Sequence, residues 1–192
     1  NIGFMMAPIH HPAVKYVMPA RQMLGTRTIF NILGPLTNPA GVKYQLTGAY
    51  NKGLLVPMAE TLRLLGSKKA WMVHGKDGTD EISISGSSYI VELKNNKINS
   101  FEISPTDAGL STHTFESISG GTPSQNADAI KALISGKISP FRDSVLLNAA
   151  AAMIIAEKTT TLKEGVRLAA TAIDSGASAE TLRVLSKITS EK

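Results

Sequence analysis

Two hydrophobic periodicities alternate along this chain. Strand-like patterns, alternating or short and apolar, occupy residues 2–7, 44–50, 70–73, 82–84, 89–93 and 98–103. Helical spacing of apolar residues occupies 13–24, 54–65, 125–134, 143–157, 162–174 and 179–188. Strands alternate with helices first, an antiparallel patch follows, and helices end the chain. This order predicts an α/β fold with a mixed, mostly parallel sheet flanked by helices.

The 192 residues, 43% of them apolar, suffice for one sizeable core or for one domain plus a fragment, and we expect one α/β domain over residues 1–192. The longest apolar run, residues 145–156, is interrupted by Asn148 and is about half of the ~20 residues that a membrane span needs. No signal-peptide pattern is present, so we expect a cytoplasmic protein without a membrane partner. The first residue is Asn1 and a strand pattern begins immediately, so we expect a piece of a longer protein.

Composition limits the chemistry. The chain has no cysteine, which excludes disulfides, zinc ribbons, iron–sulfur clusters and a thiol nucleophile. The net charge is +5, and no acidic residue precedes Glu60. Such an acid-free stretch indicates an anionic ligand, namely a phosphate, a carboxylate or nucleic acid, although a solvated face remains the alternative.

Arg21 is the strongest single candidate for holding that anion. It follows Val14 by seven residues, about two helical turns, so the two share one face, and His11 lies just before it. Pro19 removes one hydrogen bond and kinks the same helix. The guanidinium fork matches a carboxylate with two hydrogen bonds, whereas the alternative is an ordinary surface arginine.

Asp80 and Glu81 are the only adjacent acids in the chain and follow a turn at residues 75–79. On a regular strand their carboxylates would point to opposite faces, but at a turn they can converge on one hard cation such as Mg²⁺. Spacing alone does not separate this metal site from a solvated hairpin end.

Several motifs together resemble the anthranilate phosphoribosyltransferase family. The most specific is Arg27-Thr28-Ile29-Phe30-Asn31-Ile32-Leu33-Gly34-Pro35-Leu36-Thr37-Asn38-Pro39-Ala40. Further matching segments, in the order of the family, are residues 4–13, 19–25, 73–81, 120–126 and 142–152. The resemblance covers nearly all of the chain and implies the larger domain of a nucleoside phosphorylase/phosphoribosyltransferase-like fold.

The resemblance implies a transfer of phosphoribose from phosphoribosyl pyrophosphate to the amine of anthranilate, with release of pyrophosphate, in tryptophan biosynthesis. By position, Arg21 matches the arginine that holds the anthranilate carboxylate. Asp80 and Glu81 match the acid pair that helps bind Mg²⁺ on the pyrophosphate. The positions that match the lining of the anthranilate path are Ala7, Pro8, His11 and Val14. Val14 replaces an aromatic side chain that some members have.

Two motifs of the family are absent from these 192 residues: the Gly-Thr-Gly-Gly-Asp loop that cradles pyrophosphate and a Lys-His-Gly-Asn segment. Both precede the matched region in relatives, together with a small helical domain that makes the dimer contact. The resemblance therefore implies the C-terminal, larger-domain portion of an enzyme that is homodimeric at full length. We expect this portion alone to be inactive.

Two other functions stay open. A pyrimidine nucleoside phosphorylase has the same fold but would need a pocket that reads a base. A nucleic-acid-binding relative of the transferases is compatible with the sequence pI of about 9.5. The five basic residues before Glu60 are widely spaced with few aromatic residues between them, so we favour the transferase and expect no nucleic-acid partner.

Overall fold

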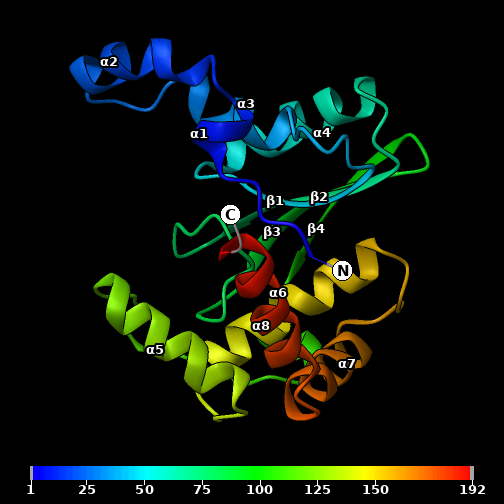
Figure 1. Ribbon diagram of the computed structural model, residues 1–192. Coiled ribbons are helices and arrows are strands. Elements are labelled where there is room, and N and C mark those ends of the chain that lie inside the picture. Colours follow the sequence, from blue (N-terminus) through cyan, green and yellow to red (C-terminus); the bar gives the residue numbers. More distant parts are fainter. Residues whose placement is uncertain (1, 191–192) are drawn as a thin grey trace.

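The computed structural model describes residues 2–190, with a four-stranded sheet in the order β1-β2-β3-β4 (Figure 1). The strands are β1 (Tyr44–Gly48), β2 (Lys69–Gly75), β3 (Ser88–Lys94) and β4 (Lys97–Ile103). Strand β1 pairs with β2 in parallel, whereas β2 with β3 and β3 with β4 are antiparallel. The α/β class is confirmed, but the prediction of a mostly parallel sheet is wrong for these strands.

Short connections explain this correction. Parallel neighbours need a long crossover, usually a helix, and α4 (Leu55–Leu64) provides one between β1 and β2. Strands β3 and β4 are joined instead by a tight turn at Asn95 and Asn96, whose φ angles are 50° and 62°. Asparagine tolerates this left-handed conformation, which reverses the chain direction at once.

Helices cover both faces of the sheet. Along β2, Ala70 and Met72 pack on the α4 side, whereas Trp71 and Val73 pack in the core that includes α6 (Pro140–Ile155). This two-residue alternation puts an apolar layer on each side, as expected for a strand buried on both faces. Figure 1 shows α4 and α6 on opposite sides of the sheet.

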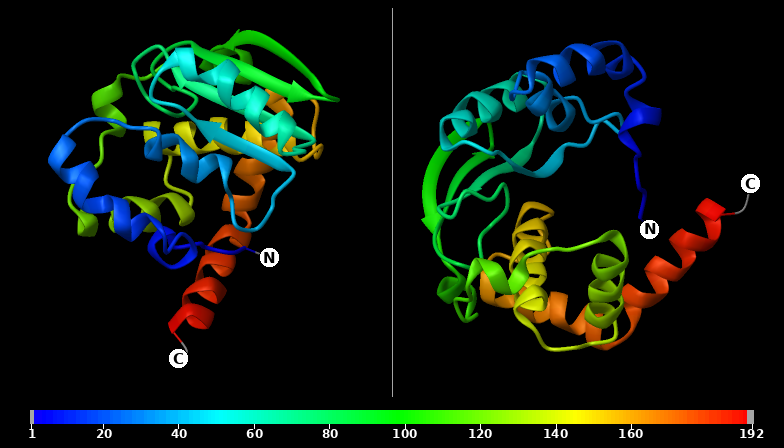
Figure 2. Two further views of the ribbon diagram at one scale, coloured as in Figure 1. Left: turned by 90° about the horizontal axis from the view of Figure 1, so that it is seen from above. Right: turned by 90° about the vertical axis from the view of Figure 1, so that its left-hand side faces the viewer.

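The other helices extend these two layers (Figure 2). Their bounds are α1 (Ala7–His10), α2 (Val14–Leu24), α3 (Phe30–Leu36), α5 (Pro123–Ile134), α7 (Leu162–Asp174) and α8 (Ala177–Ser190), with short 3₁₀ turns at Lys52–Leu54, Pro105–Ala108 and Phe115–Ile118. Helix α7 packs closely on α6, since a Cβ added to Gly165 would lie 2.7 Å from the Cα of Ala150. No helix within residues 2–190 is long and apolar enough to span a membrane.

Two predicted strands are wrong, and the other predicted elements are confirmed with ends shifted by a few residues. Residues 2–6 form no strand and are exposed, and helix α1 begins at Ala7. Residues 82–84 are buried but pair with no strand of the sheet, because side chains satisfy the backbone there. An apolar pattern predicts burial, but a strand also needs a neighbouring backbone.

Candidate functional site

The carboxyl ends of β1 and β2 open onto a cavity of about 520 Å³. It is lined by Leu46, Gly48, Val73, Asp80, Glu81, Phe141, Ser144, Val145, Asn148, Ala149 and Ala152. Ligands of open α/β sheets bind at this end of the strands. The cavity therefore combines the expected location with the predicted pair of acids.

Gly48, at the end of β1, allows the segment that carries the acids to cross the strand closely. A Cβ added to Gly48 would lie 1.5 Å from the backbone oxygen of Asp80, far inside any permitted contact. Only glycine fits there, because every other side chain would displace the backbone of Asp80. This role of Gly48 has no local sequence signal.

Asn148 of α6 holds the same segment from the other side. Its Oδ1 accepts a hydrogen bond from the N–H of Ile82 at 3.0 Å, and its Nδ2 donates to the Ile82 oxygen at 3.0 Å. Nδ2 also donates to the oxygen of Ser144 at 3.0 Å. Ile82 is 1% exposed, so its backbone depends on this amide instead of on water. The sequence signal for Asn148 was its polarity within an apolar run.

The turn before the acids is fixed by Asp77. Its carboxylate accepts hydrogen bonds from the N–H and Oγ1 of Thr79, at 3.1 and 2.8 Å, and from the hydroxyl of Ser83. Burial acts most strongly and raises the pKa of Asp77, but the hydrogen bonds from Ser83 and Thr79 together outweigh it and lower that pKa. Asp77 is thus charged at neutral pH and holds the turn through three hydrogen bonds.

The carboxylates of Asp80 and Glu81 are exposed, and neither has a hydrogen-bond or ion-pair partner in the described part of the chain. Within residues 2–190 no group of three or more His, Asp or Glu side chains could hold a metal ion. Two carboxylate oxygens fit a Mg²⁺ ion that takes its remaining ligands from water and phosphate. The donor chemistry therefore fits the predicted metal.

Arg21 lies on the half-buried face of α2 together with Val14 and Val17, as the helical spacing predicts, and half-buried His11 lies just before the helix. Its guanidinium donates to the Sδ of Met18 at 3.9 Å and has no acidic partner in the described residues. A half-buried arginine whose guanidinium has no counter-charge is suited to an external anion.

The predicted site residues therefore fall into two groups. Asp80 and Glu81 line one cavity, whereas Arg21 and Val14 share a face of α2, His11 lies just before that helix, and none of these three lines the cavity. The side chains of Ala7 and Pro8 lie outside the described part of the structure. Among the described residues, the cavity of Asp80 and Glu81 is thus lined without any member of the second group.

Comparisons with known proteins identify the family. A sequence model described as "Glycosyl transferase family, a/b domain" matches residues 1–179. An anthranilate phosphoribosyltransferase of Methylocella silvestris is 53% identical over 96% of this chain and 53% of its own length. One of Rhodopseudomonas palustris strain BisB5 is 51% identical over 98% of this chain and 56% of its own length. The chain thus spans about half the length of these relatives.

Solved structures of anthranilate phosphoribosyltransferases share the backbone of this chain. The anthranilate phosphoribosyltransferase of Thermus thermophilus is 39% identical, with a TM-score of 0.88 over 95% of this chain and 54% of its own. The enzyme of Saccharomyces cerevisiae in complex with PRPP and Mg is 29% identical, also with a TM-score of 0.88, over 95% of this chain and 53% of its own. Both the sequence match and the shared backbone extend over nearly all of the residues described above. The chain therefore belongs to the glycosyl transferase family and carries its a/b domain.

Proposed function

We propose that this chain is the α/β part of an anthranilate phosphoribosyltransferase, which transfers phosphoribose from phosphoribosyl pyrophosphate to the amine of anthranilate and releases pyrophosphate. The observation that carries the proposal is the pair of unpartnered carboxylates, Asp80 and Glu81, at a cavity at the carboxyl end of the sheet. Identity of 53% with a relative of that name, over 96% of this chain, supports it.

Asp80 and Glu81 serve the pyrophosphate end of the reaction. They would hold Mg²⁺, which, when bound, supplies positive charge to the leaving pyrophosphate. Related structures from yeast contain Mg, one of them together with PRPP. Gly48 and Asn148 fix the backbone beside the two acids, so the segment that carries the carboxylates is held in place before substrate arrives.

Arg21 serves the acceptor end. Its guanidinium would bind the anthranilate carboxylate through two hydrogen bonds, with His11 and Val14 beside the aromatic ring. Ala7 and Pro8 belong to the same path by resemblance. A related yeast structure holds 4-fluoroanthranilate, which is an aromatic carboxylate of this kind. Held there, the amine attacks the ribose C1 as pyrophosphate leaves, so the chain needs no covalent nucleophile.

Within the described residues, Arg21 does not line the cavity of Asp80 and Glu81. The function therefore needs the part of the relatives that this chain does not span. We propose that this part supplies the glycine-rich loop and the helical domain, and completes both the pyrophosphate site and a homodimer. Residues 1–192 alone should then leave anthranilate unconsumed.

A chimera tests the function directly. The matching half of the Methylocella silvestris relative is replaced by residues 1–192, and the loss of anthranilate fluorescence is followed with PRPP and Mg²⁺ present. We expect turnover, and no phosphorolysis of uridine or thymidine. A folded chimera that consumes uridine or thymidine with phosphate, or that is inactive with anthranilate, would contradict the proposal.

Arg21→Ala in the same chimera tests the acceptor site. Losing a charged, two-point hydrogen bond should raise the anthranilate KM by about tenfold or more and leave the PRPP KM unchanged. Lys15→Ala is the control, because Lys15 lies on the same helix and is exposed. An unchanged anthranilate KM in Arg21→Ala would remove the role assigned to Arg21.

A further inference from the structure

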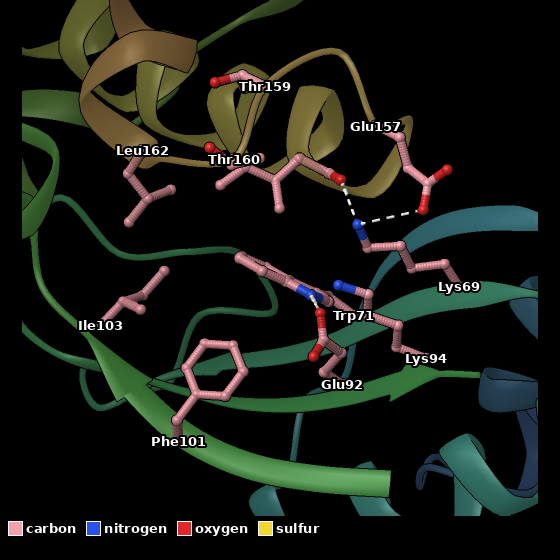
Figure 3. Close-up of a pocket in the computed structure, with 11 residues that line it drawn as sticks. Lys69, Trp71, Glu92, Lys94, Phe101, Ile103, Glu157, Thr159, Thr160 and Leu162 are labelled. Atoms are coloured by element: carbon pink, nitrogen blue, oxygen red, sulfur yellow. Dashed lines mark hydrogen bonds and ion pairs between the residues drawn. The ribbon is translucent and has the colours of Figure 1, made fainter. Parts of the chain in front are cut away.

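A second cavity, of about 550 Å³, lies between the sheet and the loop that joins α6 to α7 (Figure 3). One part of it is apolar and aromatic. The rings of Trp71 and Phe101 meet edge to face, with centroids 5.4 Å apart at 80°. Trp71 is 4% exposed and Phe101 is 36% exposed, so the Phe101 ring remains available for a planar group to stack against, with Trp71 behind it.

This aromatic cavity adjoins a basic one of about 420 Å³, because Lys69, Lys94 and Glu157 line both. The basic cavity is also lined by Arg63 and Lys68, and Glu157 is the only acid among the described residues that line it. Four cations around one carboxylate leave an excess of positive charge, which attracts a multivalent anion.

The cations are available. The side chains of Arg63, Lys68 and Lys94 are exposed and have no hydrogen-bond or ion-pair partner in the described part of the chain. A phosphate group bound among them would gain charge-assisted hydrogen bonds without breaking existing ones. They therefore form an anion site that the protein itself leaves unsatisfied.

The junction between the two cavities is rigid. The ammonium of Lys69 is buried and donates to the backbone oxygen of Ile154 at 2.6 Å, at the carboxyl-terminal end of α6, where a positive charge is stabilised. The same ammonium lies 3.9 Å from the carboxylate of Glu157, whose side chain is 59% exposed. Figure 3 shows this contact at one end of the aromatic cavity. Glu157 thus presents an accepting oxygen between the aromatic ring and the basic residues.

The two adjoining cavities form one groove. Along this groove, the aromatic surface of Phe101 comes first, then the carboxylate of Glu157, and then the cations. We propose that this groove binds a mononucleotide-like ligand, with its base on Phe101, its sugar hydroxyls donating to Glu157 and its phosphate among Lys94, Arg63 and Lys68. No described residue lines both this groove and the cavity of Asp80 and Glu81. The ligand is thus separate from the substrates of the proposed transfer, and its binding needs no transferase activity.

Trp71 provides the assay, because it is the only tryptophan of the chain and its ring contacts Phe101. Residues 1–192 are titrated with adenosine 5′-monophosphate, with adenosine and with inorganic phosphate, and binding is followed by tryptophan fluorescence and by calorimetry. We expect saturable binding of the nucleotide, weaker binding of adenosine, and competition by inorganic phosphate.

Variants locate the site. Lys94→Ala should weaken nucleotide binding about tenfold through the lost charged hydrogen bond, and Phe101→Leu should weaken binding of both nucleotide and adenosine. Lys137→Ala is the matched control, because Lys137 is exposed, without a side-chain partner in the described residues and outside the groove. The proposal is overturned by absence of saturable binding, by equal affinity in Lys94→Ala and Lys137→Ala, or by loss of binding in Asp80→Asn instead.

Discussion

Replacing Asn148 by leucine removes the side chain that holds the acid-bearing segment in place. Leucine has a similar size but no polar atom, so the N–H and the oxygen of Ile82 both lose their partner. Ile82 is 1% exposed, and the new apolar side chain keeps water away. Two buried backbone groups are then left without hydrogen bonds.

The loss of stability follows from the number of buried backbone groups that lose a partner, which is two. Each buried polar group left unpaired costs about 1–3 kcal/mol, so Asn148→Leu should lower the free energy of unfolding by about 2–6 kcal/mol. Asn148→Ala should cost less. Asn148 lines the cavity of Asp80 and Glu81, so water can enter the space and bond to Ile82, at about 0–2 kcal/mol for its immobilisation. The larger side chain should therefore be the more damaging one.

Urea unfolding followed by Trp71 fluorescence measures both variants. At about 1–3 kcal/mol per molar urea, Asn148→Leu should lower the midpoint by on the order of 1 M or more. Asn99→Leu is the control, since Asn99 is exposed on β4 and its side chain has no partner in the described residues. If Asn148→Leu were no worse than Asn148→Ala, or matched Asn99→Leu, the clamp on Ile82 would not be what stabilises this segment.

Two further predictions concern the same segment. Gly48→Ala forces a Cβ against the backbone oxygen of Asp80 and should cost about 1–3 kcal/mol or more, whereas Gly86→Ala meets nothing within 4 Å and should be neutral in the same unfolding assay. A harmless Gly48→Ala would contradict the close crossing. Asp77 has a pKa below its ordinary 3.8 in the folded state, so it stabilises the fold above that pH and loses this effect as the pH falls through the folded pKa. The stability advantage of wild type over Asp77→Asn should be full at neutral pH and decline below about pH 4; an advantage that stays constant into strong acid would refute the assignment.

The sequence predicts elements well where one local pattern decides them. In β2, alternate residues pack on opposite faces, and in α2 the spacing of Val14 and Arg21 gives one half-buried face. Prediction from the sequence fails where a residue far away in the chain determines whether a strand forms. Residues 82–84 have the apolar pattern of a strand, but their backbone is satisfied by Asn148, which is 66 residues away from Ile82.

The site of Asp80 and Glu81 likewise has features that the sequence predicts and features that it does not. Adjacent acids after a turn are visible in the sequence, and so is the asparagine that interrupts the apolar run of α6. The contact between Gly48 and Asp80 depends on how the turn crosses the end of β1, which only the tertiary fold determines. The separation of Arg21 from the acids is likewise a property of the packed elements, and spacing along the chain gave no sign of it.

The acidic cavity and the basic groove lie at opposite ends of β2, and this separation explains why each depends on a ligand for its counter-charge. Lys69 begins the strand at the basic groove, and the strand ends at Gly75, beyond Val73, which lines the acidic cavity. The backbone of Asp80 lies against Gly48, whose register partner in β2 is Val73, four residues from Lys69. At about 3.3 Å per residue these positions lie ~13 Å apart along the strand, more than one Debye length at physiological salt, which is about 8 Å. The lysines of one end are therefore screened from Asp80 and Glu81 at the other. Asp80 and Glu81 at one end, and Arg63, Lys68 and Lys94 at the other, have no partner of opposite charge among the described residues. A cation at one end and an anion at the other can therefore bind without displacing an internal partner.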